Sequence, residues 1–194
     1  MPKSSTKTVR AILEAANRIV QEQGVEHLTL DQTAREAGVS KGGLLYHFPS
    51  KEALIEGMIL YYLERFSEDY RQAAARDQDA GRGRWTRAYL YTTYEDYQRI
   101  PRMTSGLLAA MGTNPELLAP MQRAFAEWVG RLENDGVDPT ITTIIRLAVD
   151  GLWLVELFGL AQPDLQRRAQ VLAALDALSR KTPAELGIQP AGAE

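Results

Sequence analysis

Cysteine is absent from the 194-residue sequence, and histidine occurs only at His27 and His47. The lack of cysteine excludes disulfide bonds, thiolate metal sites and thiol catalysis. The sequence also offers no cluster of ligands with metal-binding spacing, no glycine-rich phosphate loop and no Gly-x-Ser-x-Gly turn. We therefore expect neither an enzyme nor a metal or cofactor site.

Long hydrophobic runs are missing as well. Residues 1–7 hold no apolar core of a signal peptide. The longest apolar region, residues 148–161, is interrupted by Asp150 and Glu156 and is too short to cross a bilayer. We expect a cytoplasmic protein with no membrane partner.

The strict alternation of apolar and polar residues that would indicate β-strands is not found either, and no internal repeat occurs. Apolar residues recur instead at helical spacing, and the chain is long enough to bury a real core. We predict an all-α fold. The expected helices cover about residues 7–23, 29–37, 41–47, 52–75, 85–99, 101–111, 115–134, 139–160 and 163–180.

The most specific pattern lies between residues 28 and 51. An amphipathic helix over residues 29–37 ends at Gly38, and Ser40 stands at the N-cap position of a second short helix over residues 41–47. A helix, a turn of three or four residues and a short helix with a polar outward face are typical of a helix-turn-helix DNA reader. An ordinary helical hairpin inside a core is the alternative.

Two glycines in the second helix favour the DNA reader. Gly42 and Gly43 each cost about 1 kcal/mol relative to alanine inside a helix, so we infer that another molecule approaches the backbone there. Side chains able to reach phosphates lie near helix starts, which bind anions, or on one outward face. These side chains belong to Thr29, Ser40, Tyr46, His47 and Lys51.

The net charge of −3 is unevenly distributed. Residues 1–51 hold seven of the 22 basic residues and five of the 25 acidic residues, so this segment carries +2 and the remainder −5. Because phosphate affinity depends on local charge, the asymmetry suits an N-terminal DNA-binding domain on an acidic body.

Residues 37–54, Ala-Gly-Val-Ser-Lys-Gly-Gly-Leu-Leu-Tyr-His-Phe-Pro-Ser-Lys-Glu-Ala-Leu, closely resemble the N-terminal DNA-binding domain of the TetR/AcrR family of transcriptional regulators. Residues 12–16, Gly24 and residues 28–30 match the same pattern in order and spacing, and the resemblance covers about residues 7–60. Many members carry a hydroxyl residue where this chain has Gly43. The resemblance implies an N-terminal three-helix helix-turn-helix domain followed by a C-terminal helical bundle for ligand binding and dimerisation.

We accordingly predict a DNA-binding domain over residues 1–51, an effector-binding and dimerisation domain over residues 52–181, and a flexible tail over residues 182–194. The helix that starts near residue 51 links the two domains. The helices over 139–160 and 163–180 carry enough apolar surface to form half of a four-helix interface. We expect a homodimer through these last two long helices, as the resemblance also implies.

The predicted body is rich in aromatic and methionine side chains, which either fill a core or line a cavity. The resemblance implies an effector pocket in this region, and such a lining suits an apolar or amphipathic small molecule. The candidate pocket residues are Tyr62, Phe66, Trp85, Tyr89, Tyr94, Met103, Leu107, Met111, Phe125, Trp128, Trp153 and Phe158.

Charged residues in the body raise two further expectations. Asp150 and Glu156 lie in an otherwise apolar helix, where each either faces a ligand, lies on an exposed seam, or pairs with Arg146 or another arginine. A run of basic side chains around residue 80 is interpreted as a solvent-exposed face rather than an anion site. This run consists of Arg71, Arg76, Arg82, Arg84 and Arg87.

The sequence thus predicts a homodimeric DNA-binding regulator, a repressor that a small-molecule effector releases from a palindromic double-stranded operator. The expected DNA contacts come from Thr29, Ser40, Lys41, Gly42, Gly43, Tyr46, His47 and Lys51. Two alternatives remain, a helical binding or scaffolding protein without DNA binding and a ligand-dependent activator.

Overall fold

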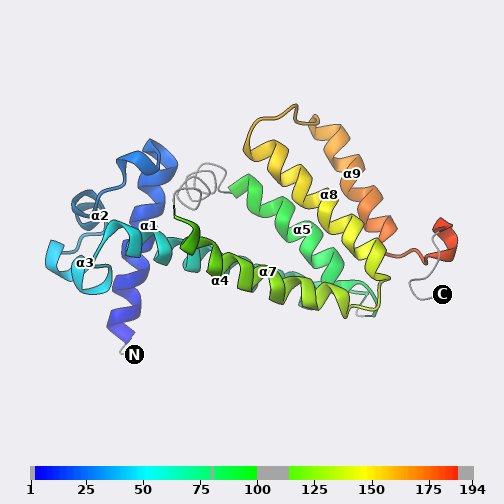
Figure 1. Ribbon diagram of the computed structural model, residues 1–194, viewed down its shortest axis with the longest axis horizontal. Helices are drawn as coiled ribbons and strands as arrows, with labels where there is room; N and C mark the ends of the chain where they lie inside the picture. Colours follow the sequence, from blue (N-terminus) through cyan, green and yellow to red (C-terminus); the bar gives the residue numbers. More distant parts are fainter. Residues whose placement is uncertain (1–2, 80, 100–113, 188–194) are drawn as a thin grey trace. The chain divides into compact units, whose positions relative to one another are not determined.

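The computed structural model describes residues 3–79, 81–99 and 114–187, and all regular elements within them are α-helices or short 3-10 helices (η), which confirms the all-α prediction (Figure 1). The predicted helix over 101–111 lies outside the described residues. The elements in chain order are α1 (Lys3–Gln23), η1 (Val25–His27), α2 (Leu30–Glu36), α3 (Lys41–His47), α4 (Lys51–Arg76), α5 (Arg84–Arg99), η2 (Pro115–Leu117), α7 (Leu118–Glu133), α8 (Pro139–Leu157), α9 (Leu165–Leu178) and η3 (Ala184–Leu186).

Several predicted helix ends lie a few residues away from their observed positions; α1, for example, begins at Lys3 instead of residue 7. α8 stops at Leu157, before the predicted residue 160, and Gly159 in the following turn has a φ of 65°. That left-handed conformation suits glycine and ends a helix. α9 begins at Leu165 instead of residue 163, because the Asp164 carboxylate accepts a 2.7 Å hydrogen bond from the amide of Arg167 and caps the helix.

The chain divides into two compact units. The first comprises Met1–Arg65 and Ile100–Arg123, and the second Phe66–Arg99 and Ala124–Glu194. α4 contributes its first fifteen residues, 51–65, to the first unit and the rest to the second. One continuous helix is therefore shared by both units.

The core of the first unit is built on α1. α1 packs against α2, and α2 packs against α3. Ile12 and Ala16 of α1, Leu44 of α3 and Leu54 and Met58 of α4 are completely buried. The periodic apolar stripe of α1 thus anchors the two short helices, which have too few residues to be stable alone.

Gly57 in α4 leaves room for an aromatic ring of the same unit. A Cβ at this position would lie 2.5 Å from Cε1 of Phe48 and 3.3 Å from a methyl group of Leu13, both of which are buried. Phe48 is the residue that ends α3, so this contact helps to hold α3 in place.

We expect Gly57→Ala to lower the free energy of unfolding by about 1–3 kcal/mol, because overpacking a core forces rings and backbone to shift. Urea denaturation followed by circular dichroism measures the change. Gly130→Ala in α7 is the matched control, since a Cβ there meets nothing within 4 Å. The control should gain up to about 1 kcal/mol from helix propensity. Equal stability of the two variants would show that Phe48 does not need the space at Gly57.

In the second unit α5, α8 and α9 lie side by side (Figure 1). Leu90 of α5 and Ile141, Ile145 and Val149 of α8 are almost completely buried. The last helix is followed by η3, within the segment predicted to be a flexible tail. Glu185 accepts hydrogen bonds from the amide of Thr182 at 2.8 Å and from Lys181 at 2.9 Å. This part of the predicted tail is therefore structured.

None of the helices in the described parts of the chain is both long and apolar enough to span a bilayer.

Candidate nucleic-acid interface

α3 is a two-turn helix with one face buried in the protein and the opposite face exposed to solvent. The Ser40 hydroxyl accepts a 3.0 Å hydrogen bond from the amide of Gly43 and caps the helix, as predicted. Leu44 is completely buried, whereas Tyr46 keeps 85% of its surface exposed. Lys41 is also exposed. The helix thus presents a polar face with an aromatic side chain on a rigid support.

The two glycines of α3 are not required by the packing of the protein itself. A Cβ on Gly42 would meet nothing within 4 Å, and a Cβ on Gly43 would meet only the Ser40 hydroxyl, at 3.2 Å. Both residues lie within α3, and neither is among the glycines with positive φ. The surface at Gly42 is therefore open for close approach by another molecule.

The hydroxyl groups of Thr29 and Ser40 have a structural role in the protein. The Thr29 hydroxyl accepts a 3.2 Å hydrogen bond from the amide of Gln32 and caps α2, in the way Ser40 caps α3. A hydroxyl oxygen that accepts such a bond still has its own hydrogen to donate. Both side chains are exposed at helix starts, where a phosphate oxygen would find donors.

The basic side chains of the site already have partners. The ammonium group of Lys41 lies 2.9 Å from the Asp31 carboxylate, and both side chains are more than half exposed. Lys51 donates a 3.2 Å hydrogen bond to the carbonyl of Val25 in η1. His47 packs edge to face on Tyr46, with ring centroids 5.0 Å apart.

Asp31 was not identified from the sequence. It lies in the first turn of α2, where an acidic side chain is favourable for the helix dipole and needs no further explanation. Its contact with Lys41 depends on the angle between α2 and α3, which no spacing in the sequence reveals. The carboxylate therefore belongs to the candidate interface for a reason visible only in three dimensions.

Several candidate pocket aromatics form one continuous cluster in the second unit. The ring centroids of Phe66 and Trp128 are 4.4 Å apart, and Phe66 also contacts Tyr89 at 6.1 Å. Trp85 joins through Tyr70, which the prediction did not include, at 5.2 Å. Phe125 lies 5.0 Å from Trp128. In the structure these rings pack on one another.

The other pocket candidates are distributed differently. Tyr62, in the first unit, and Tyr94 and Trp153, in the second, are partly buried, and Phe158 is 54% exposed. Met103, Leu107 and Met111 lie outside the described residues.

The two acids in α8 both pair with arginine. Asp150 accepts a 2.8 Å hydrogen bond from the Tyr89 hydroxyl and lies 3.6 Å from Arg146. Burial raises the pKa of Asp150, although these two partners act in the opposite direction. Glu156 lies 2.5 Å from Arg168 of α9, and burial raises the pKa of Glu156 as well.

One member of the arginine run that was interpreted as a solvent-exposed face is buried, so that interpretation is wrong for Arg87. Its side chain is 3% exposed, and its Nε donates a 2.8 Å hydrogen bond to Asp77. A charged group is buried when its donors are satisfied, and sequence spacing did not reveal the acids that satisfy Arg87. The other four arginines of the run are exposed.

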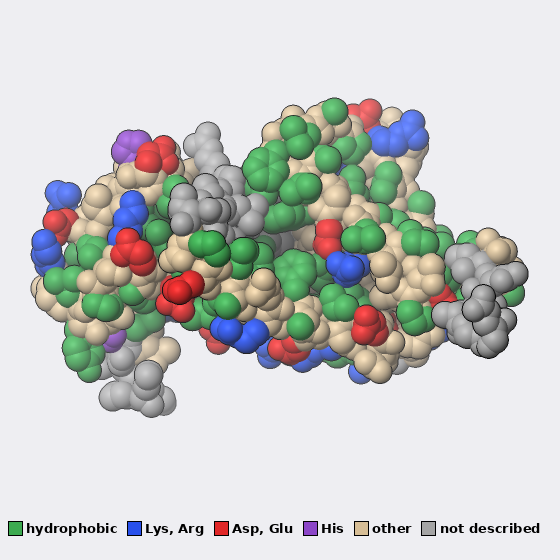
Figure 2. Space-filling view, viewed as in Figure 1, with side chains coloured by type: hydrophobic (Ala, Val, Ile, Leu, Met, Phe, Trp, Pro, Cys, Tyr) green, Lys and Arg blue, Asp and Glu red, His purple; other side chains and the backbone are tan. Residues whose placement is uncertain are grey.

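A large apolar surface remains open on α8. Ile144, Leu147, Leu154 and Phe158 recur at helical spacing and are 44–57% exposed; we call them the α8 stripe. α9 adds exposed small residues, Ala169, Ala173 and Ala177. Figure 2 shows hydrophobic side chains on the surface over these helices. Surfaces of this kind are typical of helical dimer interfaces.

Comparisons with known proteins agree with an N-terminal helix-turn-helix segment followed by a helical C-terminal part. The family model for bacterial regulatory proteins of the tetR family matches residues 12–58. The model for the tetracyclin repressor-like C-terminal domain matches residues 83–180.

Two curated relatives match different lengths of this chain. The nucleoid occlusion factor SlmA of Haemophilus ducreyi is 32% identical over 151 residues, which cover 76% of this chain and 69% of SlmA. The transcriptional regulator RutR of Escherichia coli is 42% identical over 73 residues, 34% of either chain.

Solved structures share the fold at low sequence identity. A member of the TetR family from Streptomyces coelicolor has a TM-score of 0.65 and 24% identity, covering 90% of this chain and 98% of its own. The multidrug binding protein EbrR, complexed with imidazole, has a TM-score of 0.62 and 23% identity, covering 90% and 93%. The helix-turn-helix geometry, the two family models and the SlmA relationship lead to one conclusion. The chain belongs to the tetR family of bacterial regulatory proteins and is a DNA-binding transcriptional regulator.

Proposed function

We propose that the protein is a homodimeric repressor that binds a palindromic operator and leaves it when a small apolar or amphipathic molecule binds its second unit. The observation that carries the DNA-binding part is the outward face of α3. Tyr46 is 85% exposed and Gly42 opens onto free space, while the buried Leu44 fixes the helix. A short rigid helix with a small, polar outer face fits the major groove of duplex DNA.

The proposed contacts divide into two classes. Lys41 and Tyr46 meet base edges or phosphates, and Gly42 and Gly43 allow the helix to come close. The DNA backbone is held by the groups at the rim of the site, which are Thr29, Ser40, His47 and Lys51. When Lys51 contacts a phosphate, its ammonium group must either leave the carbonyl of Val25 or bind both groups at once.

The homodimer is proposed to form through α8 and α9. The α8 stripe is too apolar to remain in water without cost, and α9 offers small side chains beside it. A twofold axis would place two α3 helices on successive turns of one DNA face, about 34–36 Å apart or somewhat more. The operator would then be an inverted repeat.

The proposed effector would bind among the aromatic side chains of the second unit. Phe66, at the heart of the ring cluster, lies in α4, and the same helix begins directly after the DNA-reading segment. A ligand that shifts α4 can therefore alter the positions of the two readers. The change in DNA affinity is limited to the ligand's preference between the two states.

Selection of bound sequences from a random DNA library tests the proposal. The expected result is an inverted repeat that is bound by two chains, with an affinity that falls steeply with salt. Binding that remains sequence-independent at every salt concentration, or a site without twofold symmetry, would contradict it.

Asp31→Asn should increase the affinity for random-sequence DNA by roughly fivefold, which corresponds to about 1 kcal/mol. The change frees Lys41 from its 2.9 Å partner and removes a negative charge that would face the phosphates. Affinity for the selected operator should rise less, so the ratio of specific to non-specific binding falls. Fluorescence anisotropy with both DNAs measures the ratio.

Glu36→Gln is the matched control. It removes the same charge from the same helix, but Glu36 pairs with Arg18 at 3.3 Å instead of with a residue of α3. Equal effects of the two substitutions would mean that only net charge matters and that Asp31 has no special position.

A further inference from the structure

Arg35 is an exposed arginine in the last turn of α2, the helix that precedes α3. It is not among the DNA contacts expected from the sequence. With the residues that the structure describes, its guanidinium group forms neither an ion pair nor a side-chain hydrogen bond. A permanently charged group with five hydrogen-bond donors is therefore open to solvent beside the candidate interface.

Both acidic side chains of α2 already pair with basic side chains of other helices. Asp31 precedes Arg35 by four residues, a spacing at which an acid and an arginine commonly pair along a helix. The Asp31 carboxylate lies instead 2.9 Å from the ammonium group of Lys41 in α3. Glu36 lies 3.3 Å from Nε of Arg18 in α1. These two pairs between helices leave the only basic side chain of α2 unmatched.

The face of α2 that carries Arg35 borders the start of α3. Residues four apart lie on the same face of a helix, so Arg35 shares its face with Asp31. Asp31 in turn reaches Lys41, the first residue of α3. In helix-turn-helix proteins the first helix crosses the DNA backbone while the second lies in the major groove. Arg35 therefore lies on the side of α2 from which a backbone phosphate can be reached.

The backbone at Arg35 is held in a fixed position relative to the turn before α3. The amide of Gly38 donates a 3.1 Å hydrogen bond to the carbonyl of Arg35, and the amide of Val39 donates a 3.0 Å bond to that of Ala34. With a φ of 67° at Gly38, these bonds form a Schellman motif. Thr33 and Ala34 are buried beneath it. A contact from Arg35 would therefore order only its side chain, since the backbone is already ordered.

We propose that Arg35 contacts a backbone phosphate at the flank of each operator half-site, with two parallel hydrogen bonds from its guanidinium group. This inference rests on the proposed position of α3 in the major groove. A phosphate contact carries no sequence information. Arg35 should therefore strengthen binding to the operator and to random-sequence DNA by the same factor, unlike a residue that reads base edges.

Arg35→Gln in the full chain should weaken binding to both DNAs by roughly tenfold, because a dimer loses two charge-assisted contacts. The slope of log affinity against log salt concentration should become less steep by about 1.8, since each contacted phosphate contributes about 0.9. Arg35→Lys keeps the charge and should keep the slope. Fluorescence anisotropy over a series of salt concentrations measures both quantities, and the Tm of each variant shows that it is folded.

Arg65→Gln is the matched control. Arg65 is an exposed arginine of α4 in the same unit, and it also has no ion pair with the described residues. It lies about 21 Å along the helix axis from Lys51, the first residue of α4, which exceeds the Debye length of about 10 Å at 0.1 M salt. The control should leave affinity and salt slope unchanged. Equal effects of the two substitutions would overturn the proposal, because net charge alone would then explain them.

Neutralising single phosphates of the selected operator with methylphosphonate locates the contact. For the original protein, substitution of one flanking phosphate in a half-site should weaken binding by roughly threefold, since one of the two contacts is lost. Arg35→Gln should be insensitive to substitution of that same phosphate. If Arg35→Gln keeps the sensitivity of the original protein at every phosphate, the proposal is overturned while the proposed function stands. If the original protein binds no operator, both are overturned.

Discussion

Leu147→Glu is expected to convert the protein from a dimer to a monomer and to weaken operator binding by roughly a hundredfold or more. Leu147 is 57% exposed in the middle of the α8 stripe. An unpaired carboxylate at the centre of an apolar interface has to be desolvated without a partner. A single α3 helix then has to bind its half-site alone, and the affinity gained by linking two binding helices in one dimer is lost. Sedimentation velocity and fluorescence anisotropy measure the two effects.

Leu60→Glu is the control for this substitution. Leu60 is an exposed leucine of similar accessibility, 47%, in α4 and within the first unit. This variant should remain dimeric. A dimeric Leu147→Glu protein that binds its operator normally would rule out α8 as the dimer interface.

Gly42→Leu is expected to reduce operator affinity by roughly a hundredfold while leaving the fold intact. Leucine is a better helix former than glycine, and the Cβ at this position meets nothing in the free protein. The free energy of unfolding should therefore stay the same or rise by up to about 1 kcal/mol. The side chain would instead occupy the space between α3 and the base edges. Urea denaturation and anisotropy with the selected operator separate stability from binding.

Gly130→Leu serves as the comparison, because Gly130 lies in α7 and its surroundings are equally open. Its operator affinity should match that of the original protein. If Gly42→Leu also bound the operator unchanged, α3 would not approach DNA at Gly42.

The local features of the DNA-reading segment were predictable from sequence. Ser40 and Gly43 form the predicted cap, and α3 has the predicted bounds, because caps and short-range periodicity depend on neighbours within one turn. The outward position of Tyr46 followed from the same periodicity.

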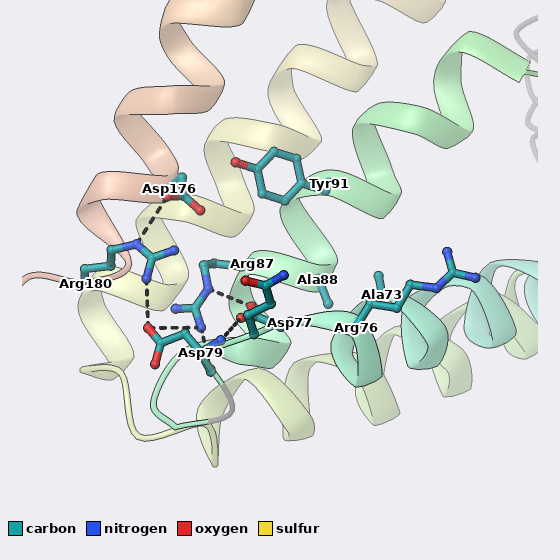
Figure 3. Close-up of a pocket in the computed structure, with 10 residues that line it drawn as sticks. Ala73, Arg76, Asp77, Asp79, Arg87, Ala88, Tyr91, Asp176 and Arg180 are labelled. Carbon is teal, nitrogen blue, oxygen red and sulfur yellow. Dashed lines mark hydrogen bonds and ion pairs between the residues drawn. The ribbon is translucent and has the colours of Figure 1, made fainter.

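Features that join distant segments were not predictable. Arg87 is buried because Asp77 and the loop carbonyls surround it, and Asp31 reaches Lys41 only through the packing of α2 on α3. Composition likewise indicated many aromatics in the body, but the mutual packing of Phe66 and Trp128 is a property of the folded chain. The ion pair between Arg180 and Asp79 shows the same limit, since it joins the turn after α9 to the loop after α4 (Figure 3).

Photo-crosslinking from α3 tests whether this helix lies against the bases of the operator. A photoreactive phenylalanine analogue at position 46, in place of the exposed Tyr46, is irradiated in the complex with the selected operator, and the same analogue at position 60 is the comparison. We expect a crosslink from position 46 to bases inside each half-site and none from position 60. A fully formed complex that crosslinks from position 60 but not from position 46 would contradict it.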